Sequence, residues 1–412
     1  MIHPKMRYTY IGIDSHKATH TAVFLDCFYG KLGEITFDNR PSKFGAFLAD
    51  AEGFKIDGTE FLFGMEDVAV YGRSLMAFLN EQGQHVKHVN AFVVARERKN
   101  LSITQKTDSV DAECAARVLL NRFDTLPDAV ARDQFWILRT LVTRRAGLVR
   151  SNTGLKYHLH GLLTAHYPNY RNYFQFIDRQ TSLAFFMRYP SPSTLSGVTV
   201  EELADFLFDA SGGKRGFAKA QEILGSLEDT AVEMQEIRDL AVQSAIRQIQ
   251  FNLNELEQLE TTLEQVLAGF NCTLTSMNGI DVVSAAQLLS CIGDITRFST
   301  PAKLAQYAGI APVTYASGNK DLRYANRRGN RELNSLFFML SVRVTMVITP
   351  KNKVVNPFFY EYYHKKLSEG KTKRQALKCV QRRLVNLIWS MLTHNENYVN
   401  PPMYCLPEPP KA

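Results

Sequence analysis

Residues 8–26 read YTYIGIDSHKATHTAVFLD, and this stretch predicts two short strands joined by a turn. The two strands, Tyr8–Asp14 and His20–Asp26, are rich in β-branched and aromatic residues, which favour strands. A third strand is expected at Leu32–Phe37, after the glycine-containing turn at residues 29–31. Three consecutive strands with short connections favour an antiparallel meander.

The chain after this meander alternates between helical and strand patterns. The expected elements are, in order, a helix at Ser42–Ala51, a strand at Phe61–Met65, a helix at Gly72–Gln82, a strand at His85–Val89 and a helix at Asp108–Asn121. Alternation of this kind favours β–α crossovers that add parallel strands to a sheet. We therefore predict an α/β domain with a mixed sheet over residues 1–130.

The middle of the chain, residues 131–270, has a helical pattern. One long helix is expected at Gln134–His166. In a second stretch, apolar residues keep a spacing of three and four over about three heptads, interrupted by Glu260. They are Ile246, Ile249, Leu253, Leu256, Leu263 and Leu267. We predict that the two stretches pair as an antiparallel coiled-coil arm, with loops and short helices at its far end in the Pro-, Ser- and Gly-rich residues 190–216.

The last region, residues 271–400, is predicted to be mainly helical, with an irregular proline-rich tail at 401–412. The glycine turn at Asn278–Ile280 fits either a helix-hairpin-helix that binds a DNA phosphate or an ordinary turn between core helices. The basic segment Lys371–Arg383 contains no acidic residue and predicts a helix that is either solvated or faces nucleic acid. The aromatic residues between positions 358 and 363 are expected to pack in the core.

Composition and charge restrict the class of protein. The chain has 412 residues, 45% of them hydrophobic and 22% charged, which is ordinary for a soluble protein of two or three domains. The formal net charge of +7 suits nucleic acid, although a basic enzyme without a polyanionic partner is the alternative. The six cysteines form no C-x-x-C pair, which argues against structural zinc and disulfides. No apolar run reaches the roughly 18 residues of a membrane helix, so we expect a cytoplasmic protein with no membrane contact.

Four acidic residues follow a pattern that is typical of a metal cluster. Asp14 ends the first strand and Glu66 follows a later one, whereas Asp108 and Asp111 lie three apart on one face of a helix start. Such carboxylates repel one another unless a divalent cation lies between them, and two Mg²⁺ ions would organise a phosphodiester for in-line attack. Taken singly, each could instead be a turn, surface or N-cap residue, and Asp67 competes with Glu66. One metal cluster accounts for all four.

A second group of candidate residues surrounds Ser317. Pro312 is expected to end the preceding helix, and Ser317–Gly318 then falls in a polar loop. A hydroxyl beside several cations can attack phosphorus while they stabilise the developing charge, and the same cations would hold DNA phosphates. The basic residues that follow are Lys320, Arg323, Arg327, Arg328 and Arg331. From the residues alone, a basic loop that only positions DNA, with Ser317 as a turn residue, is the stronger interpretation.

Four motifs resemble those of the DEDD transposases of bacterial insertion sequences, which are related to the Piv and MooV invertases. In the amino-terminal region the motifs are IGIDSHK (residues 11–17) and KTDSVDA (106–112). In the carboxy-terminal region they are GIAP (309–312) and RRGNRELNSLFF (327–338), and the family's conserved serine falls on Ser317. The segment after the glutamate, EDVAVYG, departs from the family's pattern of a glutamate followed shortly by a small residue, threonine and glycine.

The resemblance implies a fold and a reaction. The amino-terminal domain would be ribonuclease-H-like, similar to the RuvC Holliday-junction resolvase, and a carboxy-terminal transposase domain would carry the serine. Asp14, Glu66, Asp108 and Asp111 would bind Mg²⁺. Ser317 would attack a DNA phosphodiester and form a covalent phosphoserine link, which conserves bond energy so that the strands rejoin without ATP.

The resemblance also implies partners. Family members act on donor and target DNA as dimers or tetramers whose active sites combine parts of two protomers, and a structured bridge RNA guides them. A coiled-coil arm would suit oligomerisation. Two other functions stay open. One is a RuvC-like, metal-dependent, structure-selective endonuclease that resolves junctions without Ser317. The other is a non-catalytic accessory protein that binds DNA or RNA through its basic carboxy-terminal region.

Overall fold

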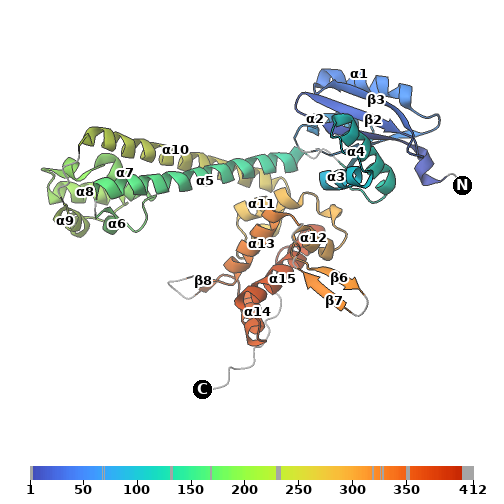
Figure 1. Ribbon diagram of the computed structural model, residues 1–412. Coiled ribbons are helices and arrows are strands. Elements are labelled where there is room, and N and C mark those ends of the chain that lie inside the picture. The colour runs from blue at the N-terminus through green and yellow to red at the C-terminus, as the bar shows by residue number, and fades with distance from the viewer. Residues whose placement is uncertain are drawn as a thin grey trace. The chain divides into compact units, whose positions relative to one another are not determined.

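The three strands expected at the start of the chain form one side of a five-stranded sheet (Figure 1). In the computed structural model the strands are β1 (Tyr8–Ser15), β2 (Thr19–Leu25), β3 (Lys31–Asp38), β4 (Glu60–Met65) and β5 (His85–His88). Their order is β3-β2-β1-β4-β5. β2 pairs antiparallel with β1 and β3, whereas β4 pairs parallel with β1 and β5. The mixed sheet predicted from the sequence is therefore confirmed.

The structure describes residues 3–400 apart from 67, 69, 130–132, 168, 229–232, 318–319, 325, 327–328 and 349–352. The predicted tail at 401–412 lies outside the described residues. The chain divides into two units, Met1–Trp136 and Ile137–Ala412. Within the described part of the chain, no helix combines the length and the apolarity that a membrane crossing requires. The cysteines described, at positions 27, 114, 272, 291 and 379, are free thiols.

Helices pack on both faces of the sheet because its central strand is apolar on both sides. Ile11 of β1 lies in a core with residues of α1 (Pro41–Ala51) and α2 (Arg73–Glu81). Tyr10, the preceding residue, lies in a separate core with α4 (Asp108–Arg122). Neighbouring side chains of a strand point to opposite faces, so α4 covers the face that α1 and α2 leave free.

Gly12 brings α4 directly onto β1. A Cβ atom at this position would lie 2.1 Å from the carbonyl oxygen of Ala112 and 2.2 Å from the backbone nitrogen of Ala116, both in α4. No side chain fits in that space, so the close approach of the two backbones requires glycine. The contact holds the first turns of α4 beside the carboxyl half of β1.

One helix of this unit is absent from the order predicted by the sequence. Helix α3 (Ala91–Asn100) follows β5, and its start is capped by Asn90, whose side chain accepts a hydrogen bond from the backbone N–H of Phe92. Its sequence, AFVVARERKN, buries only Val94. A helix with so little buried surface lacks the apolar stripe from which helices are predicted. For this reason α3 was not predicted from the sequence.

The helical middle of the chain contains two long helices that lie side by side (Figure 1). They are α5 (Asp133–His166) and α10 (Gln235–Ala268). The guanidinium of Arg145 donates a hydrogen bond of 2.8 Å to Glu260, the residue that interrupts the predicted apolar spacing. Further along, the buried amide of Asn252 donates a 2.8 Å hydrogen bond to that of Asn152. These contacts show that the two helices run antiparallel. That they form a coiled coil stays a prediction.

Short helices between α5 and α10 build a core of their own. They are α6 (Tyr170–Tyr173), α7 (Gln180–Arg188), α8 (Val200–Ala210) and α9 (Phe217–Gly225). Tyr167 and Phe186 contact each other edge-on at the centre of this core, and Leu159 of α5 and Ile246 of α10 belong to the same cluster. Residues 190–216 contain α8 between loops, which agrees with the expected loops and short helices.

The carboxy-terminal region is mainly helical, as predicted, and also contains two small hairpins. Its elements are α11 (Val282–Ile292), α12 (Pro301–Tyr307), β6 (Val313–Ser317), β7 (Lys320–Tyr324), α13 (Arg331–Val344), β8 (Val347–Ile348), β9 (Lys353–Val354), α14 (Pro357–Ser368) and α15 (Lys373–His394). Phe358 and Phe359 are buried in its core, which confirms the prediction of core packing for these two residues. The basic segment Lys371–Arg383 supplies the first half of α15.

The glycine turn at Asn278–Ile280 belongs to the core of this region. It lies between a three-residue 3-10 helix, Leu274–Ser276, and α11, so only one α-helix directly flanks it, and phosphate binding there stays a prediction. Gly279 has a φ of 106°, and a Cβ atom there would lie 2.8 Å from Cγ1 of Val344 in α13. Ile280 is buried beside it. The turn therefore packs against a neighbouring helix.

Candidate active site

Two of the four predicted carboxylates are placed by neighbouring parallel strands. Asp14 is the last but one residue of β1, and Glu66 directly follows β4. The register pairs Ile13 of β1 with Met65 of β4. The next residues, Asp14 and Glu66, therefore lie at the same end of the sheet. Carboxyl ends of adjacent parallel strands are a common location for binding residues because loops diverge there.

The other two carboxylates are placed by the start of α4. Thr107 caps this helix, its hydroxyl accepting a hydrogen bond from the backbone N–H of Val110. Asp108 and Asp111 then occupy the first turn, where negative charge interacts favourably with the helix dipole. The interpretation of Asp108 as the N-cap itself is therefore wrong. Since Gly12 holds α4 against β1, this first turn lies beside Asp14.

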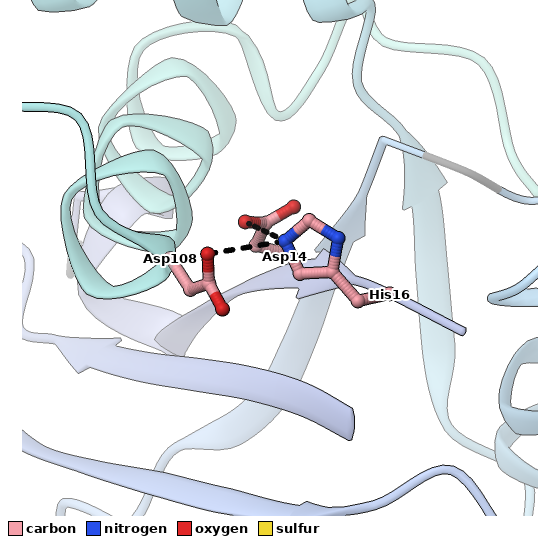
Figure 2. Close-up of side chains that lie close together, drawn as sticks. All are labelled: Asp14, His16 and Asp108. Carbon is pink, nitrogen blue, oxygen red and sulfur yellow. Dashed lines mark hydrogen bonds and ion pairs between the residues drawn. The ribbon is translucent and has the colours of Figure 1, made fainter. Parts of the chain in front are cut away.

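His16 joins Asp14 and Asp108 (Figure 2). Its Nε2 atom lies 3.2 Å from Oδ2 of Asp14 and 3.1 Å from Oδ1 of Asp108. One potential ligand atom from each of the three residues lies within 4.8 Å of the other two. The sequence analysis missed His16, although its position two residues after Asp14 was a signal, because alternate residues of an extended chain point to the same side.

Asp111 has a different partner, Arg98 of α3. The guanidinium Nη1 donates a hydrogen bond to the Asp111 carboxylate, and both side chains are largely buried. Arg98 was not predicted as a site residue because α3, which carries it, has no apolar stripe. Arg98 both neutralises and orients Asp111, since a guanidinium binds a carboxylate with fixed geometry.

The carboxylates repel one another in the folded chain. Burial, followed by the charges of Asp14 and Asp111, raises the pKa of Glu66 to about 7. Burial also raises the pKa of Asp14, with the charges of Asp108 and Asp111 adding to the rise and His16 opposing it. All four predicted carboxylates thus belong to one electrostatic cluster. Negative charge gathered in this way, and balanced only in part by His16 and Arg98, is the environment that favours a bound cation.

The donors of this cluster fit a divalent metal ion. Carboxylate oxygens are the ligands that Mg²⁺ and other hard cations prefer, and a cation would relieve the repulsion that raises the pKa of Glu66. Among the described residues, Asp14 and Asp108 lie close enough together, with His16, to share one ion. Metal binding by Glu66 and Asp111 stays a prediction. Chemically, such a site can bind phosphate oxygens through the ion and stabilise charge at a reacting phosphorus.

Ser317 lies in the second unit, and its local structure differs from the prediction. The preceding helix α12 ends at Tyr307, five residues before Pro312, with Gly309 following at a φ of 68°. Ser317 is the last residue of β6 and pairs in register with Lys320 of β7, so it ends a hairpin strand and does not lie in a loop. Pro312 precedes this strand and does not end the helix.

The basic residues after Ser317 are only partly described. Lys320 and Arg323 lie on β7, whereas Arg331 is exposed at the first position of α13. Arg327 and Arg328 lie outside the described residues, as do the side-chain positions of Ser317, Lys320 and Arg323. The roles expected for these residues therefore stay predictions.

Two family models match the chain, one in each half. Residues 11–168 match the DEDD transposase model named for IS110, and these residues include all four carboxylates and His16. Residues 271–360 match the model described as the transposase family of IS116, IS110 and IS902, and these include Ser317. The two candidate sites thus fall in separate family segments.

Relatives from insertion elements match most of the chain. It is 27% identical over 392 residues to an uncharacterized 44.8 kDa protein of insertion element IS116 from Streptomyces clavuligerus, covering 93% of this chain and 94% of the relative. It is 29% identical over 300 residues to an uncharacterized 43.6 kDa protein of insertion element IS110 from Streptomyces coelicolor, covering 71% and 72%. A pilin gene-inverting protein of Moraxella bovis is 27% identical over 156 residues, or 35% of this chain and 45% of that protein.

Proposed function

Because the chain belongs to the IS116/IS110/IS902 family of transposases, we propose that it cuts and rejoins the DNA strands of an insertion sequence through a covalent protein–DNA link. The observation that carries this proposal is the carboxylate cluster built from β1, β4 and α4, which lies within the segment matched by the DEDD transposase model. Such a cluster suits phosphodiester chemistry, since a cation held there can bind phosphate oxygens.

In this proposal the acidic cluster binds the metal. Asp14, Glu66, Asp108 and Asp111 hold Mg²⁺, which when bound supplies positive charge to stabilise the transition state at phosphorus. Arg98 keeps the Asp111 carboxylate in place. Gly12 keeps Asp108 next to Asp14 through the contact between α4 and β1. The sheet and one helix start thus bring Asp14 and Asp108 together, which supports the proposal.

Ser317 is the proposed nucleophile. Its Oγ loses its proton and bonds to the phosphorus of a DNA phosphodiester, the bond from phosphorus to the leaving strand breaks, and the leaving oxygen takes up a proton as a hydroxyl group. Attack by that hydroxyl, or by one from another strand, reverses the step and frees the serine. The basic residues at 320, 323, 327, 328 and 331 would hold the phosphates of the strands. This assignment rests on the family's motif around Ser317.

The proposed partners follow from the same family. DNA is the substrate, and one relative is named for inverting a pilin gene, which is a DNA rearrangement. We also propose a guiding bridge RNA and a homo-oligomer, dimer or tetramer, as the resemblance implies. RNA that co-purifies with the full-length protein and derives from beside its own gene would support the guide. Random cellular RNA alone would count against it.

The decisive experiment is to trap the covalent intermediate. The full-length protein is incubated with Mg²⁺ and DNA that carries the ends of its own insertion sequence, and the products are separated under denaturing conditions. We expect a protein–DNA adduct that maps to Ser317 by mass spectrometry and disappears in Ser317→Ala. Ser335→Ala, a change of the same kind on the exposed surface of α13, should leave the adduct intact.

Two outcomes would favour the other functions. Cleavage that persists in Ser317→Ala without an adduct would identify a RuvC-like endonuclease that uses water at the acidic cluster. DNA binding without cleavage, unchanged by both Asp14→Asn and Ser317→Ala, would identify an accessory binding protein. Either result would show that the serine mechanism is wrong.

A further inference from the structure

The imidazole of His16 occupies an unusual position between two carboxylates (Figure 2). Its Nε2 atom is 3.2 Å from Oδ2 of Asp14 and 3.1 Å from Oδ1 of Asp108. A single ring nitrogen carries at most one proton, so it can donate one good hydrogen bond and must share it between two negatively charged oxygens. One proton on Nε2 would therefore be shared between two carboxylate oxygens.

The same three atoms have the spacing of neighbouring ligands around a metal ion. Two ligands that lie at right angles, each about 2.1 Å from an ion, are about 3.0 Å apart. Both distances from Nε2 are close to that value, and the third pair also lies within 4.8 Å. A cation between these three atoms would be bound by the lone pair of a neutral Nε2 and by one oxygen from each carboxylate.

The surroundings leave room for an ion and its water ligands on one side. The side chains of His16 and Asp108 are 53% and 54% exposed, whereas that of Asp14 is 13% exposed. The backbone carbonyl of His16 accepts a hydrogen bond from Nδ2 of Asn39, which fixes the chain at this point. The imidazole is thus anchored at its base and open to solvent at its edge, as a ligand to a partly hydrated ion must be.

We propose that His16 is a nitrogen ligand of the metal site, together with Asp14 and Asp108, and that it makes this site prefer Mn²⁺ to Mg²⁺. The physical reason is the chemistry of the donors. Mg²⁺ is bound in proteins almost entirely by oxygen. Mn²⁺ also favours oxygen ligands, but as a first-row transition ion it accepts an imidazole nitrogen beside them more readily than Mg²⁺ does. This inference rests on the proposed function only in placing the metal at the acidic cluster.

The test uses Mn²⁺ as a paramagnetic probe of the full-length protein without DNA. Pulsed electron paramagnetic resonance detects a ¹⁴N nucleus bonded to Mn²⁺, and we expect this signal in the wild-type protein and its loss in His16→Asn. Titration should show that His16→Asn weakens Mn²⁺ binding by at least about tenfold and Mg²⁺ binding by less. The matched control is His158→Asn, a change at an exposed histidine of α5, which should alter neither affinity.

The outcomes separate this inference from the proposed function. A wild-type protein that binds Mn²⁺ without a ¹⁴N signal would overturn it, as would equal losses of Mn²⁺ and Mg²⁺ affinity in His16→Asn. Unfolding curves of the metal-free variant, if unchanged, exclude misfolding as the cause of weaker binding. A ¹⁴N signal in a protein that never forms a DNA adduct would support the nitrogen ligand while contradicting the serine recombinase.

Discussion

At the scale of single residues, Glu66 shows how the acidic cluster opposes folding. Burial is the first cause of its raised pKa of about 7, and the charges of Asp14 and Asp111 add to it. At neutral pH the folded chain must therefore either keep a proton on this carboxyl or accept repulsion among the three groups. Functional sites commonly hold charges that a purely structural sequence would avoid, because their ligand supplies the missing compensation.

Replacing this carboxyl should stabilise the metal-free protein. In Glu66→Gln we expect the melting temperature of the first unfolding transition, measured in EDTA at pH 8, to rise by a few degrees. Because the pKa of Glu66 is higher in the folded chain than in the unfolded chain, protonation of this carboxyl stabilises the folded state at low pH. That stabilisation is lost as pH rises through about 7. The stabilising effect of the substitution should therefore be largest above pH 7 and small near pH 4.

The same variant should respond less to metal. Added Mg²⁺ is expected to raise the melting temperature of the wild-type protein, because binding to the folded state alone stabilises it. In Glu66→Gln the increase should be much smaller. A control, Glu369→Gln, removes an exposed carboxylate of the second unit that pairs with Lys366, and it should leave the metal response unchanged. An equal Mg²⁺ response in Glu66→Gln and wild type would remove Glu66 from the metal site.

At the scale of elements, the contact between α4 and β1 decides whether the cluster exists. The two pairs of carboxylates come from elements that are far apart in the sequence, and Gly12 is where those elements meet. Any side chain there would push α4 away from the sheet and carry Asp108 away from Asp14. The glycine motif IGID is therefore as important for the site as the aspartate within it.

Gly12→Ala should thus weaken both the fold and the metal site. We expect a loss of at least about 2 kcal/mol of stability, because overpacking against backbone atoms cannot be relieved by a side-chain rotation. Mg²⁺ binding should weaken in parallel. Chemical denaturation and metal titration measure the two effects.

The matched control is Gly45→Ala in the exposed part of α1, where a Cβ atom would meet nothing within 4 Å. That change should stabilise the protein by about 0.5–1 kcal/mol, since alanine is preferred to glycine inside a helix. Equal effects of the two substitutions would contradict the role given to Gly12.

Helix α15 carries the basic segment predicted as a nucleic-acid surface or a solvated face. It contains no acidic residue, and its first turn has Lys373 and Arg374 where the helix dipole favours acids. Partial burial, followed by the charge of Arg374 one turn earlier, lowers the pKa of Lys378. No large aromatic side chain of α14 or α15 is exposed among the described residues, so the segment offers charge and no surface for base stacking.

We therefore expect this helix to contact the backbone of duplex DNA. Replacing Lys371, Arg374 and Lys378 by Gln should weaken binding to a labelled duplex of arbitrary sequence. The salt dependence should become shallower, with the slope of log affinity against log salt falling by about 2–3 for three lost phosphate contacts. The control removes the same charge from Lys214, Arg247 and Lys303, which are exposed elsewhere in the unit. Equal losses of DNA affinity in both variants would show that the effect comes from net charge alone.

At the scale of the whole molecule, the chain is a sequence of units that each have a core. The amino-terminal unit packs its sheet between α1 and α2 on one face and α4 on the other. The second unit contains one core among α6–α9 and another among α11–α15. A unit with its own closed core has the means to fold without the rest of the chain.

The amino-terminal unit should therefore fold alone and keep its metal response. A fragment of residues 1–132 is expected to unfold cooperatively and to melt at a higher temperature when Mn²⁺ or Mg²⁺ is present. A shorter fragment, residues 1–100, lacks α4 and leaves one face of the sheet uncovered, so it should not unfold cooperatively. An unfolded 1–132 fragment would show that this unit depends on the second one.

The amino-acid sequence alone determined the local elements of this protein. The strands β1 to β5 and the helices α1, α2 and α4 follow from β-branched runs and from apolar spacing. The acidic residues were identifiable because each lies at the end of a strand or in the first turn of a helix. Helix α3 and the strand that ends at Ser317 were not predicted. The helix buries one residue and the strand is five residues long, so neither has a strong periodic pattern.

Only the tertiary structure decided which groups interact. It placed His16 between Asp14 and Asp108, and Arg98 of the unpredicted helix beside Asp111. It also placed the glycine turn at Gly279 against Val344 of α13. The physical reason is that hydrophobic spacing depends on neighbours along the chain, whereas a charge interaction depends on distance in space. That distance is set where α4 meets Gly12, more than ninety residues away in the sequence.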